Sequence, residues 1–246
     1  MKKSISIIGF GNFGKLAVKH LILSGANVLV TDVENKSQEA EILGAKFVSL
    51  EKVLQNKIII IAVPMEKFVE TLMNIKDKIK KDSIIIDVCS LKIFSCNAME
   101  KILPKNIKII GSHPLFGPQS AKNSIEGMKM ALINVRADIK TFNKVKKFCK
   151  SLKLKVIITT PEEHDKEMAV SQALTHFICQ VCKKIDINRV GLSTKTFENL
   201  MDIIDIVKND TPALFNNMQQ MNPFAIKIRK DFINNAKELD VQLGSK

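Results

Sequence analysis

The chain of 246 residues contains no tryptophan and no tyrosine, so its 13 phenylalanines are its only aromatic side chains. Its formal net charge is +13. No stripe of basic residues alternates with aromatic residues on which nucleic-acid bases would stack. We therefore expect a lysine-rich, solvated surface that attracts anionic small molecules, and no nucleic-acid partner.

Long apolar runs and paired cysteine patterns are also lacking. No run approaches the ~20 residues that span a bilayer, and the amino terminus has no signal-peptide pattern. We therefore expect no membrane partner. Five cysteines are an odd number, which indicates reduced thiols in a cytoplasmic protein. Cys179 and Cys182 form a C-x-x-C pair inside a helical pattern without a second pair, so we expect no metal site.

The first motif present is a glycine-rich turn. Residues 4–8 have the pattern of a buried strand, Gly-Phe-Gly-Asn-Phe-Gly follows at once, and a helical pattern comes next. In this context the first glycine permits a tight turn, the second lets a pyrophosphate approach the backbone, and the third lets helix and strand pack closely. The helix N-terminus favours phosphate. The residues expected to bind a dinucleotide are Gly9, Phe10, Gly11, Asn12, Phe13 and Gly14.

Two further positions bear on the cofactor. The second strand pattern ends at Asp32. A carboxylate there accepts hydrogen bonds from the ribose hydroxyls and repels a 2′-phosphate, which favours NAD over NADP. The isoleucine run 58–61 predicts a buried parallel strand. Val63 and Pro64 follow it and should lie beside the cofactor.

Strand and helix patterns alternate along the first part of the chain, and only helical patterns follow. We expect α/β architecture, with a Rossmann-type, doubly wound parallel sheet over 1–160 and an all-α domain over 161–246. Thr160 and Pro161 are typical of a helix start. The helical part is too short to enclose a core comfortably, so we expect a homodimer paired through it. The predicted strands are 4–8, 27–31, 46–48, 57–62, 83–88, 107–111, 129–135 and 154–159.

Two loops carry candidate catalytic residues. Residues 111–118 read Gly-Ser-His-Pro-Leu-Phe-Gly-Pro and place His113 in a loop after a predicted strand. Residues 87–92 read Asp-Val-Cys-Ser-Leu-Lys and place Ser90 after another. Open α/β sheets bind ligands at the carboxyl ends of their strands. We therefore predict that His113 accepts a proton and that Ser90 hydrogen-bonds the same substrate hydroxyl.

A polar face is expected on the first helix of the second domain. Asp165, Ala169, Gln172 and His176 follow one another at intervals of four, three and four, which in an α-helix is one face. The pattern predicts a polar wall of a substrate pocket that faces the carboxyl edge of the sheet. Asp165 either caps its helix or binds a substrate ammonium group.

These segments together resemble the prephenate and arogenate dehydrogenases of tyrosine biosynthesis, most closely the plant-type arogenate dehydrogenases. The resemblance implies oxidative decarboxylation of arogenate or prephenate to tyrosine or 4-hydroxyphenylpyruvate, with hydride transfer to a nicotinamide cofactor. By position, His113 resembles the catalytic base, Ser90 its hydrogen-bonding helper and His176 a substrate-binding histidine. The segments that carry the resemblance are GFGNFG at 9–14, DVCSLK at 87–92, SHPLFGP at 112–118 and EHDKEMAVSQALTH at 163–176.

The chain departs from the family pattern at the substrate carboxylate. Many bacterial members have an arginine shortly before an Asp-Pro pair, whereas residues 205–212 contain none. Gln119, a candidate substrate contact, stands where some relatives have glutamate. The candidates for binding the ring carboxylate are Lys195, Lys122 and Arg136.

Two alternative functions remain. A β-hydroxyacid dehydrogenase would also join a Rossmann domain to helices, with Lys183 or Lys184 as its catalytic lysine. A non-catalytic NAD-sensing domain would bind the cofactor but would not need the polar face at 165–176. Loss of the His113 side chain would separate the first alternative from the main hypothesis.

Overall fold

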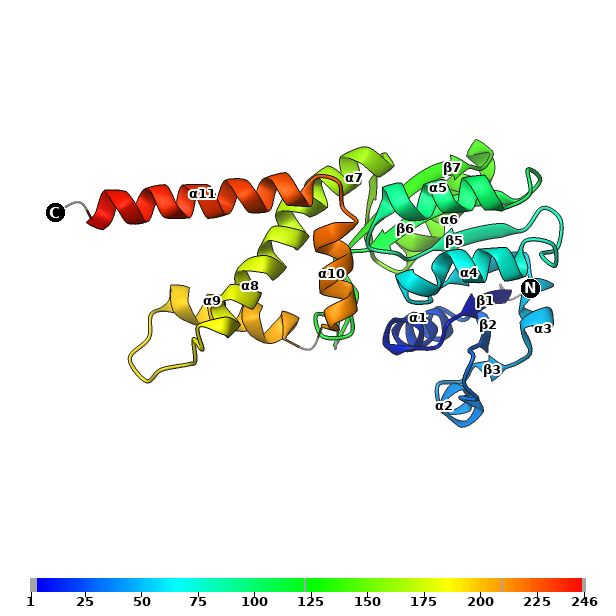
Figure 1. Cartoon of the computed structure of the whole chain (residues 1–246). Helices are drawn as coiled ribbons and strands as arrows, with labels where there is room; N and C mark the ends of the chain where they lie inside the picture. Colours follow the sequence, from blue (N-terminus) through cyan, green and yellow to red (C-terminus); the bar gives the residue numbers. More distant parts are fainter. Residues whose placement is uncertain (1–3, 122, 209, 245–246) are drawn as a thin grey trace. The chain divides into compact units, whose positions relative to one another are not determined.

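The computed structural model describes the chain except residues 1–3, 122, 209 and 245–246 (Figure 1). Two compact units divide the chain, Met1–Pro161 and Glu162–Lys246. Strands and helices alternate in the first unit. Its strands are β1 (Ser4–Ile8), β2 (Asn27–Thr31), β3 (Lys46–Phe47), β4 (Ile58–Ile61), β5 (Ile84–Asp87), β6 (Lys108–Pro114), β7 (Lys129–Arg136) and β8 (Lys155–Ile158). Its helices are α1 (Asn12–Leu23), α2 (Ser37–Ile42), α3 (Leu50–Leu54), α4 (Met65–Ile75), α5 (Lys92–Ile102) and α6 (Ile139–Ser151).

All eight strands form one sheet in the order β3-β2-β1-β4-β5-β6-β7-β8. The predicted doubly wound arrangement is confirmed for β1 to β6, which run parallel. One edge of the sheet departs from the parallel direction, because β7 pairs antiparallel with β6 and β8 then runs parallel to β7. The described residues of the connection from β6 to β7 form no helix, and a parallel return needs a crossover connection that usually contains one.

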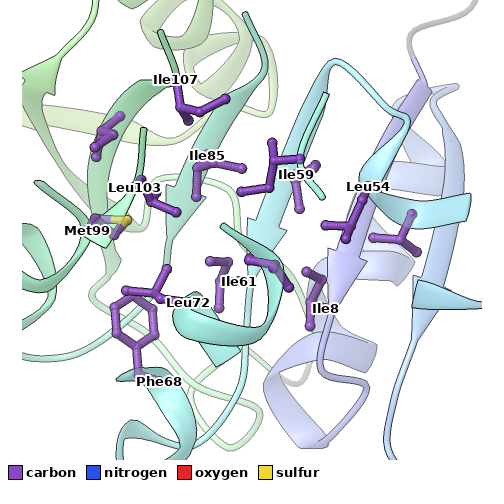
Figure 2. Packing of buried hydrophobic residues seen from close by; sticks show 14 of the residues in the cluster. Ile8, Leu54, Ile59, Ile61, Phe68, Leu72, Ile85, Met99, Leu103 and Ile107 are labelled. Carbon is purple, nitrogen blue, oxygen red and sulfur yellow. The ribbon is translucent and has the colours of Figure 1, made fainter. Parts of the chain in front are cut away.

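The core of this unit explains the continuous isoleucine run of β4. Successive strand residues point to opposite faces of the sheet. Ile59 and Ile61 are completely buried and pack with α4 and α5 residues on one face, as Figure 2 shows around Phe68, Leu72 and Met99. Ile58 and Ile60 pack against the clusters that contain α1 and α6 on the other face. Burying each such side chain contributes about 1.5–3 kcal/mol, which favours this strand at the centre of the sheet.

Among the described residues of the second unit, the regular elements are all helices, as the sequence predicts. Its helices are α7 (Pro161–Met168), the π-helix η1 (Ala169–Leu174), α8 (Thr175–Lys184), α9 (Lys195–Val207), α10 (Pro212–Gln220) and α11 (Ala225–Gly244). Helix α7 begins at the predicted proline, and it continues through η1 into α8. In the part of the chain that the structure describes, no helix is both long and apolar enough to cross a membrane.

Candidate active site

The glycine turn joins β1 to α1. At two of its three glycines, a side chain would collide with neighbouring backbone atoms. Gly9 has a φ of +100°, and a Cβ there would lie 2.5 Å from the carbonyl oxygen of Ala62. A Cβ on Gly14 would lie 2.2 Å from the carbonyl oxygen of Gly9. Around Gly11, in contrast, nothing lies within 4 Å of the Cβ position. The turn therefore presents an open backbone surface at the N-terminus of α1, where a pyrophosphate fits.

Asp32 is tied to this turn. Its carboxylate accepts hydrogen bonds from the backbone N–H of Phe10 at 2.6 Å and of Glu34 at 3.1 Å. Its Oδ1 also lies 3.4 Å from Nζ of Lys36. Partial burial raises the pKa of Asp32, but these hydrogen bonds and the lysine outweigh it and leave the pKa below its ordinary value. The carboxylate is therefore held ionised next to the glycine turn.

The other predicted cofactor residues lie around the same turn. Phe10 is fully buried in the core, so only its backbone faces the turn, while Asn12 and Phe13 form the first residues of α1. The backbone N of Val63 would lie 2.9 Å from a Cβ on Gly9. Pro64 then caps α4. The carboxyl ends of β1 and β4 thus meet at the centre of the sheet, where the strand order reverses and α/β proteins bind ligands.

A fully buried ion pair connects the carboxyl ends of β5 and β6. Asp87 and Lys92 are both 0% exposed, and Nζ of Lys92 donates a hydrogen bond to Oδ2 of Asp87. The other oxygen of Asp87 accepts from the backbone N–H of Ser112 at 3.0 Å, and the carbonyl of Ser112 accepts from Lys92 at 2.7 Å. Burial lowers the pKa of Lys92, but the Asp87 carboxylate outweighs this and raises it. The pair fixes the backbone that leads into His113.

His113 lies next to this ion pair, at the carboxyl end of β6. The sequence predicts that the strand stops at 111 and that His113 is in a loop, which is wrong, because the ladder with β7 continues and pairs His113 with Ala131. The residue is buried and belongs to a strand that pairs with β7. Ser90 lies in the turn between β5 and α5, so both residues are at the same edge of the sheet as the glycine turn.

The next residues are Gln119, a predicted substrate contact, and two of the candidates for binding the ring carboxylate. Gln119 is exposed in the turn after β6, and Lys122 lies outside the described residues. Arg136 is not available, because its guanidinium donates to the carbonyls of Ile107, Leu103 and Pro104 near the amino end of β6. The antiparallel direction of β7 carries it there, to the edge of the sheet opposite His113.

In the second unit, Asp165 is buried and already has a partner. Its Oδ1 lies 2.8 Å from Nδ1 of His164, which is also buried. The sequence pattern did not indicate this histidine as part of the site. A histidine next to an acidic residue near a helix start does not by itself indicate a site. The pair is recognised only in the structure, where both side chains are buried.

The single helical face predicted from 165 to 176 is interrupted. The π-helix η1 replaces the i→i+4 spacing of an α-helix by i→i+5, so intervals of three and four no longer align residues across it. Gln172 has a buried Oε1 without a hydrogen-bond partner among the described residues. His176 lies beyond η1, with Nδ1 3.1 Å from Oδ2 of Asp210. Lys195 is exposed at the first residue of α9.

Comparison with known proteins shows which family the chain belongs to. Residues 19–158 match the nucleotide-binding domain of prephenate dehydrogenase, and residues 160–246 match its dimerization domain. The chain belongs to the prephenate dehydrogenase family. The first match begins after the glycine turn, so the geometry of that turn is evidence for a nucleotide site independent of the match.

Several relatives of this family are similar over most of the chain. A probable arogenate/prephenate dehydrogenase of Methanocaldococcus jannaschii is 28% identical over 96% of the chain, and arogenate dehydrogenase 2 of Arabidopsis thaliana is 27% identical over 91%. The chain spans only 56% and 65% of these two proteins. The crystal structure of A. aeolicus prephenate dehydrogenase with hydroxyphenyl propionate and NAD+ has a TM-score of 0.78 and is 23% identical, and the match covers 100% of this chain and 93% of that one.

Proposed function

We propose that the protein catalyses the oxidative decarboxylation of arogenate or prephenate with NAD as hydride acceptor. The observation that carries this proposal is the carboxyl edge of the sheet. There the open glycine turn after β1 and the buried imidazole on β6 belong to one sheet. The family match supports this function over a β-hydroxyacid dehydrogenase or a cofactor-sensing domain.

The residues of the first unit fit NAD. The turn leaves open space only where a pyrophosphate would approach, at Gly11, and Asp32 is ionised where the adenosine ribose is expected. NAD, when bound, accepts the hydride from C4 of the substrate ring.

The remaining chemistry needs one base and firm orientation. We assign to His113 the acceptance of the proton from the C4 hydroxyl, and to Ser90 a hydrogen bond to the same oxygen. The electrons of the C1–carboxylate bond enter the ring as carbon dioxide leaves, and aromatisation drives the step, so the protein must mainly hold the reacting groups in place. Gln172 and His176 are the proposed substrate-binding residues of the helical unit.

We also propose a cytoplasmic homodimer. The second unit matches a dimerization domain, and α11 buries only Ala225 over its described length while Leu239, Val241 and Leu243 are exposed. Apolar side chains on a helix of this length are typically covered by a second copy.

Initial rates with both substrates and both cofactors test the reaction. We expect reduction of NAD with at least one of arogenate and prephenate, and carbon dioxide in equal amount. Absence of turnover with either substrate, under conditions where the protein binds NAD, would contradict the proposal.

Replacement of Asp32 by serine should reduce the ratio of NAD affinity to NADP affinity by roughly tenfold or more. The change removes the repulsion of a 2′-phosphate and the ribose hydrogen bonds, and it removes one of the two carboxylates that contact Lys36. Kd values for NAD and NADP measure the effect. Glu34→Ser is the matched control, because Glu34 also contacts Lys36 at 3.1 Å but is exposed. A wild-type protein that binds NADP more tightly would show that Asp32 does not face the ribose.

Alanine at Gly11 and at Gly9 should have separable effects. Gly11→Ala meets no atom within 4 Å, so we expect an unchanged melting temperature and at least roughly tenfold weaker NAD binding, because the Cβ occupies the pyrophosphate space. Gly9→Ala should lower the melting temperature, because its φ is +100° and its Cβ would collide with the Ala62 backbone. Calorimetry and NAD titration check both. Undiminished NAD binding by Gly11→Ala would place the pyrophosphate elsewhere.

A further inference from the structure

The π-helix η1 is held by side chains of a different helix. Nε2 of Gln219, near the end of α10, donates to the carbonyl of Ala173 at 2.6 Å. Nδ2 of Asn222, just beyond α10, donates to the carbonyl of Asp165 at 2.8 Å. Gln219 and Asn222 are 5% and 1% exposed, so both hydrogen bonds are shielded from water. The two contacts reach one carbonyl within η1 and one in the turn before it.

The orientation of the Gln219 amide is determined by a third residue. Nη1 of Arg229, on α11, lies 2.6 Å from Oε1 of Gln219. A guanidinium can only donate hydrogen bonds, so the oxygen of the amide must face Arg229 and its nitrogen must face Ala173. The guanidinium also lies 6.0 Å from the centre of the Phe177 ring on α8. Arg229 therefore fixes the donor that contacts η1.

The packing beneath these hydrogen bonds is suited to a close approach of η1 and α10. Ala169 and Ala173 of η1 are buried against Met218 of α10 and Ala225 of α11. Small side chains let the backbone carbonyls come within reach of the amides. Helices depart from α geometry where side chains compete for backbone carbonyls, and π turns occur often at functional sites.

We propose that Gln219 and Asn222 are positioning residues that maintain the π conformation of η1 and thereby set the direction of Gln172 and His176. The inference rests on the proposed function, since it takes these two as substrate-binding residues. Gln172 lies within η1, and His176 follows one residue after its end. If η1 relaxed to an α-helix, both side chains would rotate relative to Asp165 and Ala169, which are anchored in the core.

Gln219→Glu tests this with little change in size. A glutamate keeps its partner Arg229 but has no N–H to donate to Ala173. Gln220→Glu is the control, because it makes the same chemical change at the next, exposed residue of α10. We expect hydrogen exchange of the amides at 169–176 to accelerate in Gln219→Glu only. We also expect kcat/KM for the substrate to fall roughly ten- to hundredfold, mainly through KM, with NAD affinity unchanged.

Combined variants show whether Gln219 acts through Gln172 and His176. If it does, adding Gln219→Glu to the protein that carries both Gln172→Ala and His176→Ala should lose little more kcat/KM than that protein loses alone. Additive losses, or a Gln219→Glu protein with a lower melting temperature but wild-type KM, would overturn the proposal. Unchanged hydrogen exchange at 169–176 would do so as well. Because exchange needs no substrate, it tests η1 even if the wild type turns over neither arogenate nor prephenate.

Discussion

Replacement of His113 by alanine should reduce kcat by roughly 10²–10⁴-fold, the usual contribution of a positioned general base. NAD affinity should stay close to that of the wild type, because the glycine turn and Asp32 belong to β1 and β2, away from β6. His113→Asn should lose a similar factor, since an amide retains much of the shape but cannot accept the proton. Steady-state rates and NAD titration measure the two effects separately.

A histidine outside the site provides the control. His20 is in the last turn of α1, at the end of that helix remote from the glycine turn, and His20→Asn should retain wild-type turnover. A His113→Ala enzyme within a few-fold of the wild-type kcat would remove His113 from the mechanism. It would also reopen the β-hydroxyacid hypothesis, in which Lys183 or Lys184 is catalytic. In the structure, the ammonium group of Lys183 donates a hydrogen bond to the carbonyl of Lys208 at 3.5 Å, so it already has a partner within the helical unit.

Replacement of Lys92 by methionine should have the largest effect on stability. Removing one partner of a buried ion pair leaves the other charge uncompensated, which costs about 3–5 kcal/mol. That is a large part of the roughly 5–15 kcal/mol by which folded proteins are stable. Lys92 also donates to the carbonyl of Ser112, which precedes His113. We therefore expect the folded fraction of Lys92→Met to have a lower kcat than the wild type. Urea unfolding monitored by circular dichroism gives the change in the free energy of unfolding.

Two further variants show whether the buried charge is the cause. Lys101→Met changes an exposed lysine of the same helix and should alter the free energy of unfolding by less than about 0.5 kcal/mol. Asp87→Asn combined with Lys92→Met removes both charges and should recover part of the stability. A Lys92→Met protein as stable as the wild type would mean that the pair does not hold the ends of β5 and β6 together.

Much of the fold was predictable because its signals are local. The isoleucine run of β4 and the Gly-Phe-Gly-Asn-Phe-Gly turn each specify an element through the periodicity or backbone freedom of adjacent residues. The direction of β7 was not, because an antiparallel return depends on the connection it follows and on pairing with a distant strand. This one difference extends β6 through His113 and moves Arg136 to the opposite edge of the sheet.

The helical unit shows the same limit more strongly. Intervals of three and four residues predict a single face only if the helix is a regular α-helix. The sequence pattern of η1 does not indicate its π conformation. The hydrogen bonds from Gln219 and Asn222 come from residues about 50 positions further along the chain. The burial of the His164–Asp165 pair likewise depends on tertiary packing that periodicity does not encode.

In the proposed function, the protein couples NAD reduction to aromatisation of a cyclohexadienol substrate. The most direct measurement mixes the purified protein with NAD and either arogenate or prephenate, and follows NADH absorbance while the aromatic product is identified by mass spectrometry. We expect NADH and tyrosine, or NADH and 4-hydroxyphenylpyruvate, in a 1:1 ratio, and loss of both products in His113→Ala. NAD binding without NADH or aromatic product from either substrate would contradict it.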